Sequence, residues 1–570
     1  MEGPGFGLLI GLIKYHKQVI KDQERFVVSH LLSWVAVLTT LAMAPGVSFD
    51  PINVPKQVML AIGGFSAAAF LISKVKLFTE PNLRLPIFSG LIFILDLILV
   101  LVFAGNNFNQ EFFGTDGRST GFVAYFSLAT LFIAAVMIST NKVIVRFSRG
   151  LLFAGLISIV YGFVQSLGLD PVGWTNSYSP VIGFLGNPDF QSSFVAISAV
   201  FVSSLCLGKD VKAKLRGAGF LYLGAAAYVI KETGAQQGFV VLAVGSFLAL
   251  IVKVYTLRRK FLTGALMLLG ILIMFAAALG SLNKGPLSAL LHKDSVIYRG
   301  DYWRAGWKMS LEHPLFGIGL DSYGDWYRRT RTLAATIRRG PEIVSNASHN
   351  VLIDFSSNGG FPLLIIYLIL MGLVVRASWK LIKREDNFDP ILTGLIVVWI
   401  AYQAQSIISL NQLGLAVWGW IISGLIIGYE INTRSHFTQE NSRSRLTKVG
   451  PSFIIVLLVG FLTGLMAGLP PFLASAKFRN SIQTGDARII QAAAYIYPLD
   501  FVRMAQIAGT LRDNNLDTEA LLVISDAVQK FPDSFDSWRV FSTLKSATPA
   551  QVAIAKAQMK RLDPLNPDLK

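Results

Sequence analysis

Long apolar stretches constrain the fold of this chain more than any other feature of its sequence. A helix that crosses a membrane needs about 20 mostly apolar residues. Stretches of that kind occur at 27–45, 56–73, 86–104, 120–139, 150–167, 189–207, 217–230, 238–255, 261–280, 351–375, 389–409, 413–429 and 452–474. Only 15% of the 570 residues are charged, whereas soluble domains average about 25%. The sequence therefore predicts an all-α, polytopic membrane bundle of about 12–13 transmembrane helices.

The connections between these stretches alternate in charge. The N-terminal segment and every second connection carry three or four lysines or arginines each, whereas the short connections between them hold only Lys56, Arg118 and Lys231. Basic residues are retained on the cytoplasmic side of a membrane. We therefore expect a multi-pass protein of the cell membrane with a cytoplasmic N-terminus and an extracytoplasmic C-terminus. The net charge of +17 then requires no nucleic-acid partner.

The chain divides into three predicted parts. Residues 1–26 combine an apolar patch with basic residues, which predicts a cytoplasmic or interfacial helix. Residues 27–475 form the transmembrane bundle, with a large external loop at 281–350. This loop holds ten basic and six acidic residues, and long loops are translocated regardless of their charge. Its positive charge predicts an anionic partner on the outer face.

Residues 476–570 have the composition of a soluble helical domain outside the membrane. Pro498 and Pro532 lie 34 residues apart, each after a helix pair, and "LDPLNP" closes a third unit. This period is the tetratricopeptide one. A tetratricopeptide-like domain that binds an envelope protein and a simple helical cap are both open alternatives.

Metal-binding patterns do not occur in this sequence. The one cysteine, Cys206, lies in an apolar stretch, which excludes an intrachain disulfide and a cysteine metal site. The outer loops also lack the closely spaced acidic residues that a magnesium-diphosphate site needs. We therefore expect no metal and no cofactor, with arginines taking the place of a metal.

Arginines of the external loop form two candidate anion sites. Arg299 and Arg304 lie on one helical face with Trp303 and Trp307, a pattern that an interfacial helix with snorkelling arginines would also show. The segment "WYRRTRTLAATIRRG" adds five more. Guanidinium groups match the oxygens of a phosphate or diphosphate, although anionic lipid headgroups would attract them equally. The five are Arg328, Arg329, Arg331, Arg338 and Arg339.

Residues 345–362, "SNASHNVLIDFSSNGGFP", place polar groups at the start of an apolar stretch. In a helix, Asn350, Asp354 and Asn358 form one polar stripe, whereas His349 and Asp354 lie about 140° apart around the axis. We predict a half-helix that ends at the Gly-Gly pair and lines an outward cavity. His349 is either a satisfied interfacial histidine or a base, and Asp354 is either paired inside the bundle or functional.

Two Gly-rich turns lie at the outer ends of predicted spans. They are "GFLGNPDFQSS" (183–193) and "KETGAQQGF" (231–239). Irregular backbone at membrane depth is tolerated where it is buried in protein or lines a wet cavity. Both are explained by ordinary turns, and convergence on one outer cavity is the functional alternative.

Four segments resemble a known family. "YGFVQSLGLDPVGW" (161–174), "GFLGNPDFQSS", "RGDYWRAGWKMSLEHPLFGIGLDSYG" (299–324) and "SHNVLIDFSSNGGFPLLIIYL" (348–368) occur in the order typical of the O-antigen ligase and polymerase superfamily of bacterial envelope glycosyltransferases. The resemblance covers about residues 150–430, and the tetratricopeptide-like tail is similar to that of some members. It implies a GT-C-like helical membrane fold.

The resemblance also implies an activity. Members transfer a glycan from a polyprenyl diphosphate to an acceptor hydroxyl at the outer face, with inversion and without a metal. Arg299 matches the arginine that holds the diphosphate, and His349 matches the histidine that activates the acceptor. Where many ligases have Ser-Arg-Gly, this chain has Gln236 and Gln237 before a glycine. Glutamine hydrogen-bonds a phosphate or a sugar but supplies no charge.

The predicted function is thus metal-independent, inverting glycosyl transfer at the outer face. The donor is a polyprenyl-diphosphate-linked glycan, and the acceptor is a lipid, a glycan or a protein. We assign His349 and Arg299 to catalysis. The predicted substrate-binding residues are Arg304, Arg328, Arg329, Arg331, Arg338, Arg339, Gln236, Gln237, Asn350 and Asp354. A transporter for an anion or a lipid-linked sugar, and an envelope assembly scaffold that acts through residues 476–570, are the alternatives.

Overall fold

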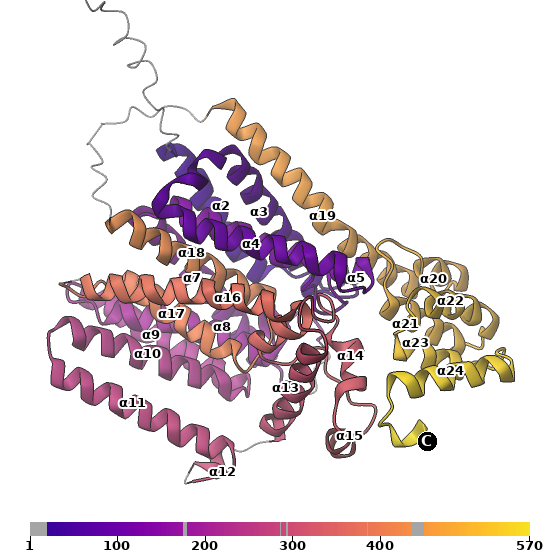
Figure 1. Ribbon diagram of the computed structural model, residues 1–570. Coiled ribbons are helices and arrows are strands. Elements are labelled where there is room, and N and C mark those ends of the chain that lie inside the picture. The colour runs from indigo at the N-terminus through magenta and orange to yellow at the C-terminus, as the bar shows by residue number, and fades with distance from the viewer. Residues whose placement is uncertain are drawn as a thin grey trace, which may run out of the picture.

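The protein is helical throughout the part that its computed structural model describes, which comprises residues 20–174, 179–285, 287–291, 294–384, 386–434 and 450–569 (Figure 1). No strand occurs among these residues. The predicted all-α class is therefore confirmed. The predicted interfacial helix at 1–26 lies mostly outside the described residues, which begin at Ile20.

Thirteen long helices of the described chain correspond one for one to the apolar stretches of the sequence. They are α2 (Asp22–Leu41), α3 (Asn53–Ser73), α4 (Pro81–Phe103), α6 (Phe122–Ile138), α7 (Asn141–Ser166), α8 (Pro188–Cys206), α9 (Ala213–Glu232), α10 (Gln236–Thr256), α11 (Lys260–Ser281), α16 (Val351–Arg384), α17 (Pro390–Ser406), α18 (Leu413–Arg434) and α19 (Pro451–Thr484). Within the described residues, nine of them are both long and apolar enough to cross a membrane on their own. The apolar helices α6 and α17 have 17 residues each, about 26 Å at 1.5 Å per residue, slightly less than a hydrocarbon core of about 30 Å.

The remaining elements belong to the connections and to the C-terminal domain. They are η1 (Val75–Thr79), α5 (Phe108–Phe113), η2 (Gly183–Leu185), α12 (Ser288–Leu291), α13 (Asp294–Glu312), α14 (Tyr323–Thr330), α15 (Leu333–Arg339), α20 (Ala487–Ala493), α21 (Phe501–Asp513), α22 (Asp517–Lys530), α23 (Phe535–Ser542), α24 (Pro549–Leu562) and η3 (Pro567–Leu569). Helices α12–α15 belong to the external loop, and α20–α24 form the C-terminal domain (Figure 1).

Helix α18 lies at the centre of the bundle, where 94% of its most apolar 18-residue stretch is buried. It is rich in glycine, and its glycines allow close approach: a Cβ on Gly424 would lie 2.3 Å from the Phe132 carbonyl oxygen of α6. Helix α11 lies at the periphery, beside α10 (Figure 1), and only 6% of its most apolar 18-residue stretch is buried. Its apolar side chains are thus left for the hydrocarbon core of a membrane.

Helix α16 is broken near its start, as the Gly-Gly pair predicts. Gly360 has φ 75° and ψ 179°, a backbone conformation open essentially to glycine alone. The "HPLFGIG" segment of the external loop pairs with this break, because Ile318 N–H donates to the Ser357 oxygen at 2.8 Å and Phe361 N–H donates to the Pro314 oxygen at 2.8 Å. The break therefore fixes the external loop to the first turns of α16.

The C-terminal domain has its own apolar core and lies beside the external loop (Figure 1). Helices α21 and α22 pack against each other, as do α23 and α24. This pairing fits the predicted helix pairs, and the tetratricopeptide assignment stays a prediction. Helix α19 continues through residue 475 to Thr484, so the predicted boundary at 475/476 falls within a helix that joins the bundle to the domain.

Candidate active site

His349 lies in the turn directly before α16, in a conformation that this turn imposes. Its φ is 56°, which is uncommon for a residue with a side chain and recurs at functional sites. The turn is held on both sides of the histidine: Asp354 Oδ1 accepts from Ser348 N–H at 2.7 Å, and Asn350 Oδ1 accepts from Leu352 N–H at 3.0 Å. Asn350 and Asp354 therefore fix the backbone on either side of the histidine. Among the described residues, His349 and Asp354 form no hydrogen bond with each other, which agrees with their predicted separation of about 140°.

The imidazole ring of His349 stacks on Tyr302 of α13. The two ring centroids are 5.4 Å apart, with 27° between the ring planes. Gly306, one turn further along α13, allows this approach, since a Cβ there would lie 2.5 Å from Ile353 Cγ2 and 3.5 Å from Ser348 Cβ. The "RGDYWRAGW" and "SHN" motifs are thus brought together by packing between α13 and the start of α16.

Three arginines surround the histidine with positive charge. Burial and, to a smaller extent, the charges of Arg118, Arg299 and Arg339 together lower the pKa of His349 to about 3. The pKa falls because both desolvation and nearby cations disfavour the charged imidazolium form. His349 is consequently neutral at pH 7, with a ring nitrogen able to accept a proton.

Arg299 is half-buried on α13 and faces the first turn of α8. Burial lowers its pKa, and the carboxylate of Asp189 on α8 opposes this shift. Within the described part of the chain its guanidinium makes no hydrogen bond or ion pair. A charged, partly desolvated group of this kind is suited to an anionic ligand.

Arg339 contacts Tyr302 as well. Its guanidinium carbon is 4.3 Å from the centroid of the Tyr298 ring, and its Nη1 donates to the Tyr302 hydroxyl. Arg339, at the end of α15, is thereby fixed to α13 through aromatic side chains, which leave its charge uncompensated.

Arg118 was not among the residues that the sequence singled out for the site. It lies in the loop between α5 and α6 and lines a small cavity with Asp321, Asn346 and Asp354. Burial lowers its pKa, while Asp321 and Asp354 raise it. One feature of the sequence could have indicated Arg118 as a site residue. It is one of only three basic residues in the short connections between the basic ones.

Asp321 holds the Arg118 loop against the external loop. Its Oδ2 accepts from Thr115 N–H at 2.8 Å and from Thr120 N–H at 3.1 Å. Burial raises the pKa of Asp321 to about 6, against the lowering by these hydrogen bonds and by Arg118. The loop that carries Arg118 is thus fixed relative to α16 and His349.

Arg304 and Arg338 share one carboxylate. Asp301 is buried and pairs with Arg338, and it lies 3.6 Å from Arg304, whose side chain is 63% exposed. The Arg338–Asp301 pair fastens α15 to α13, whereas Arg304 and Asp301 lie on the same helix. Of the two, Arg304 remains accessible to a substrate.

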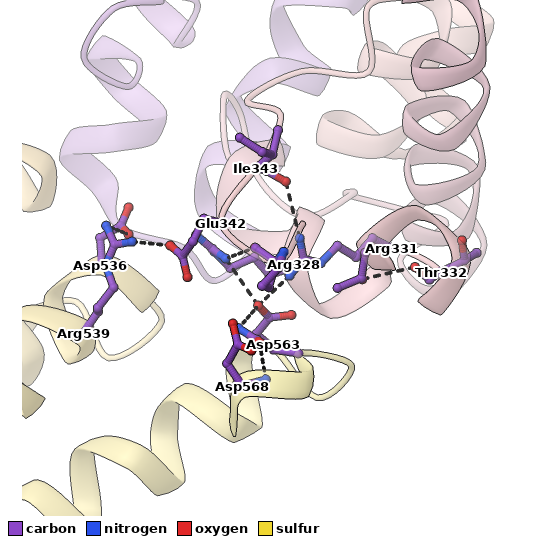
Figure 2. A network of polar contacts seen from close by, with 12 residues as sticks. Arg328, Arg331, Thr332, Glu342, Ile343, Asp536, Arg539, Asp563 and Asp568 are labelled. Carbon is purple, nitrogen blue, oxygen red and sulfur yellow. Dashed lines mark hydrogen bonds and ion pairs between the residues drawn. The ribbon is translucent and has the colours of Figure 1, made fainter. Parts of the chain in front are cut away.

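Arg328 and Arg331 lie elsewhere, at the contact with the C-terminal domain (Figure 2). Both are buried and share Asp563, with Nη–Oδ2 distances of 3.3 Å and 2.6 Å. They also donate to the backbone oxygens of Pro341 and Ile343. We call this contact the Asp563 clamp. It engages both arginines within the protein rather than toward an open site.

Arg329 also faces the C-terminal domain. It pairs with Asp533 at 3.0 Å and lies over the Trp326 ring. A further ion pair joins Glu342 to Arg539 of α23 (Figure 2). The sequence-predicted cluster at 328–339 is therefore divided, with only Arg338 and Arg339 on the His349 side.

The two Gly-rich turns lie against each other, as the convergence alternative requires. Gln237 Nε2 donates to Ser193 Oγ at 3.0 Å, and a Cβ on Gly238 would lie 2.8 Å from Ser192 Cβ. Gln237 is buried, and its Oε1 has no partner among the described residues, whereas Gln236 is exposed. Gln237 thus lies beside the first turn of α8, to which Asp189, the neighbour of Arg299, also belongs.

These features define a class: a polytopic helical membrane protein with a cationic site around a neutral histidine at one end of its bundle. Residues 218–368 match the model of the O-antigen ligase family (Wzy_C). The match includes Arg299, His349 and Asp354, and it supports a relationship of this part of the chain to the O-antigen ligase and polymerase superfamily. It supports a role in glycan transfer at a membrane by a ligase or a polymerase. No curated protein matches the chain.

Proposed function

We propose that this protein transfers a glycan from a polyprenyl-diphosphate donor to an acceptor hydroxyl, with inversion and without a metal ion. The observation that carries the proposal is the neutral histidine held among Arg118, Arg299 and Arg339. Such an arrangement provides a proton acceptor and a cationic site for a leaving anion in one place. The family match supports this class of reaction.

The arginines would bind the diphosphate. Guanidinium groups form charge-assisted hydrogen bonds to phosphate oxygens, and preorganised charge at a developing anion is usually the largest catalytic effect. Arg299 is best suited, because it has no hydrogen bond or ion pair among the described residues. Arg304, Arg338 and Gln237 flank this position.

His349 would accept the acceptor proton. The acceptor oxygen bonds to the anomeric carbon while the bond from that carbon to the diphosphate oxygen breaks. The electron pair leaves with the diphosphate, and the hydroxyl proton passes to the imidazole. A single displacement of this kind inverts the anomeric centre.

Donor binding would also strengthen the base. The three arginines lower the pKa of His349 in the free protein, and a bound diphosphate would offset their charge. The pKa of His349 then rises toward its usual value of about 6.5, where a general base is most effective near neutral pH. The histidine thus becomes a competent base only when the donor is present.

The site is proposed to face the outside of the cell membrane, with the N-terminus in the cytoplasm. The alternation of basic connections along the sequence supports this orientation. The contact between the external loop and the C-terminal domain supports placing both on the same side.

Transfer by the purified full-length protein tests the proposal. We expect glycan transfer from a polyprenyl diphosphate to an acceptor, loss of transfer in His349→Ala and Arg299→Ala, and no effect of a chelator. Lys308→Gln is the matched control, since Lys308 lies on the same helix as Arg299 and, among the described residues, pairs only with Glu312. Wild-type transfer by both site variants would refute the catalytic assignment, and uptake without transfer would favour a transporter.

A further inference from the structure

A groove at the other end of the bundle has the features of a separate binding site. It lies between the start of α4 and the last turns of α16 and α18. These are the turns that lead into basic connections of the sequence. The groove has a volume of about 150 Å³. None of its lining residues belongs to the site around His349, so the two sites are distinct.

Basic side chains from two helices line this groove. Arg376 and Lys380 lie one turn apart on α16, and Arg434 faces them from α18. Neither Arg376 nor Lys380 forms an ion pair with any described residue. Glu430 is the one acidic residue in the lining, and it is already shared by Arg384 at 3.5 Å and Arg434 at 3.3 Å. Among the described lining residues, three basic side chains therefore face one carboxylate, which leaves the groove with a net positive charge.

The walls of the groove are apolar. Leu85 of α4, Leu373 of α16 and Ile427 of α18 line it together with the basic residues. On α16, the neighbouring Val375 and Trp379 are 56% and 63% exposed, as expected for a surface in contact with lipid. A ligand with an anionic head and a hydrocarbon chain matches both parts of the lining.

The start of α4 adds a further favourable element. Pro81 and Asn82 form its first turn and line the groove. The N-terminus of a helix carries partial positive charge, which favours an anion, although Pro81 has no N–H and the N–H groups of Leu83 and Arg84 already donate to the Glu80 oxygen. Three helices thus contribute to one anion-binding environment.

We propose that this groove binds the phosphate headgroup of an anionic phospholipid, with an acyl chain lying against Leu85, Leu373 and Ile427. Basic pockets between transmembrane helices on the cytoplasmic side commonly recognise such headgroups. A free phosphate has the same charge, but it leaves the apolar walls unused. The lipid is therefore the source to which the structure points, and the site is independent of the proposed transferase activity.

Lipid binding to the full-length protein in detergent tests this proposal. Phosphatidylglycerol, phosphatidylethanolamine and inorganic phosphate are titrated separately, with bound molecules counted by native mass spectrometry. We expect one tight phosphatidylglycerol site, and its affinity should fall about tenfold or more in the double variant Arg376→Gln/Lys380→Gln.

Two further variants make the result decisive. The control variant Arg259→Gln/Lys260→Gln removes two exposed charges at the start of α11. They lie at the end of the bundle where Arg258 pairs with Asp386. This variant should keep the phosphatidylglycerol site. Arg376→Lys/Lys380→Arg keeps the charges and should also retain it, which excludes misfolding as the cause of the loss. The proposal is overturned by unchanged affinity in the Gln variant, by equal loss in the control, or by equally tight binding of phosphatidylethanolamine or inorganic phosphate.

Discussion

Two groups of arginines near the external loop have opposite environments. Arg118, Arg299 and Arg339 surround His349 and lower its pKa. Arg328 and Arg331 surround Asp563 and are buried with it (Figure 2). The residue type is the same in both groups, but Arg328 and Arg331 form ion pairs with Asp563, whereas Arg118, Arg299 and Arg339 form none with any described residue. We therefore expect the arginines without an ion pair to be available to a diphosphate, and those of the clamp to be structural.

The clamp also links the C-terminal domain to the histidine. Arg328 and Arg331 donate to Pro341 and Ile343, and the chain continues from there to His349. The two groups are therefore separate in chemistry but connected through one segment of backbone. Variants that affect one group and spare the other therefore test whether the two groups have different roles.

The largest effect is expected at the site group. His349→Gln removes the proton acceptor and should lower kcat by about 10²- to 10⁴-fold. The thermal unfolding temperature should change little, since the described contact of the ring is stacking on Tyr302. Initial rates and a thermal shift assay measure the two quantities. A fall in stability with unchanged kcat would reverse the assignment.

The next effect is expected at the clamp. Asp563→Ala leaves two buried guanidinium groups without their carboxylate, which should destabilise the contact by about 3–5 kcal/mol. Limited proteolysis of the C-terminal domain and denaturant unfolding report this change. Asp568→Ala is the control, because Asp568 is exposed nearby. Equal resistance to proteolysis in both variants would show that the clamp does not hold the domain.

A smaller effect is expected on the pH dependence. With a pKa of about 3, His349 in the free protein stays neutral as the pH falls from 8 to about 5. The acid limb of kcat/KM for the donor should therefore lie well below the usual histidine pKa, and the limb of kcat should lie at higher pH because the bound diphosphate raises this pKa. Arg339→Gln should move the kcat/KM limb upward. Coincident limbs near pH 6.5 in every variant would contradict the electrostatic coupling.

The smallest effect is expected for Arg329. Its ion pair with Asp533 is partly exposed, and exposed pairs contribute about 1 kcal/mol or less. Arg329→Gln should leave transfer unchanged and lower stability only slightly, as measured by denaturant unfolding. A loss of transfer comparable with that of Arg299→Gln would place Arg329 in the site after all.

Much of the helical frame could be predicted from the sequence. Apolar length alone located the thirteen long helices, and the Gly-Gly pair located the break at Gly360. The motif containing Arg299 and the one containing His349 were linked by the family resemblance, and packing of α13 on the start of α16 brings them together. These features depend on local pattern, which a sequence carries directly.

The partners of the arginines could not be predicted. Asp563 is 232 residues from Arg331, and no periodicity relates a carboxylate in a C-terminal domain to a guanidinium in a loop. Arg118 comes from a different loop than the other site arginines. Its place beside Asp321 depends on hydrogen bonds to Thr115 and Thr120 that form only in the folded chain.

The most direct test asks whether Arg299, and not Arg331, binds the donor. It measures binding of a polyprenyl diphosphate to the wild type, Arg299→Gln and Arg331→Gln. All three proteins are first shown to be monodisperse, and affinity is then measured by titration of the lipid diphosphate. We predict that Arg299→Gln weakens binding by tenfold or more, since a hydrogen bond to a charged group contributes about 1.5–3 kcal/mol, while Arg331→Gln binds like the wild type. Loss of binding in Arg331→Gln with wild-type affinity in Arg299→Gln would contradict the account.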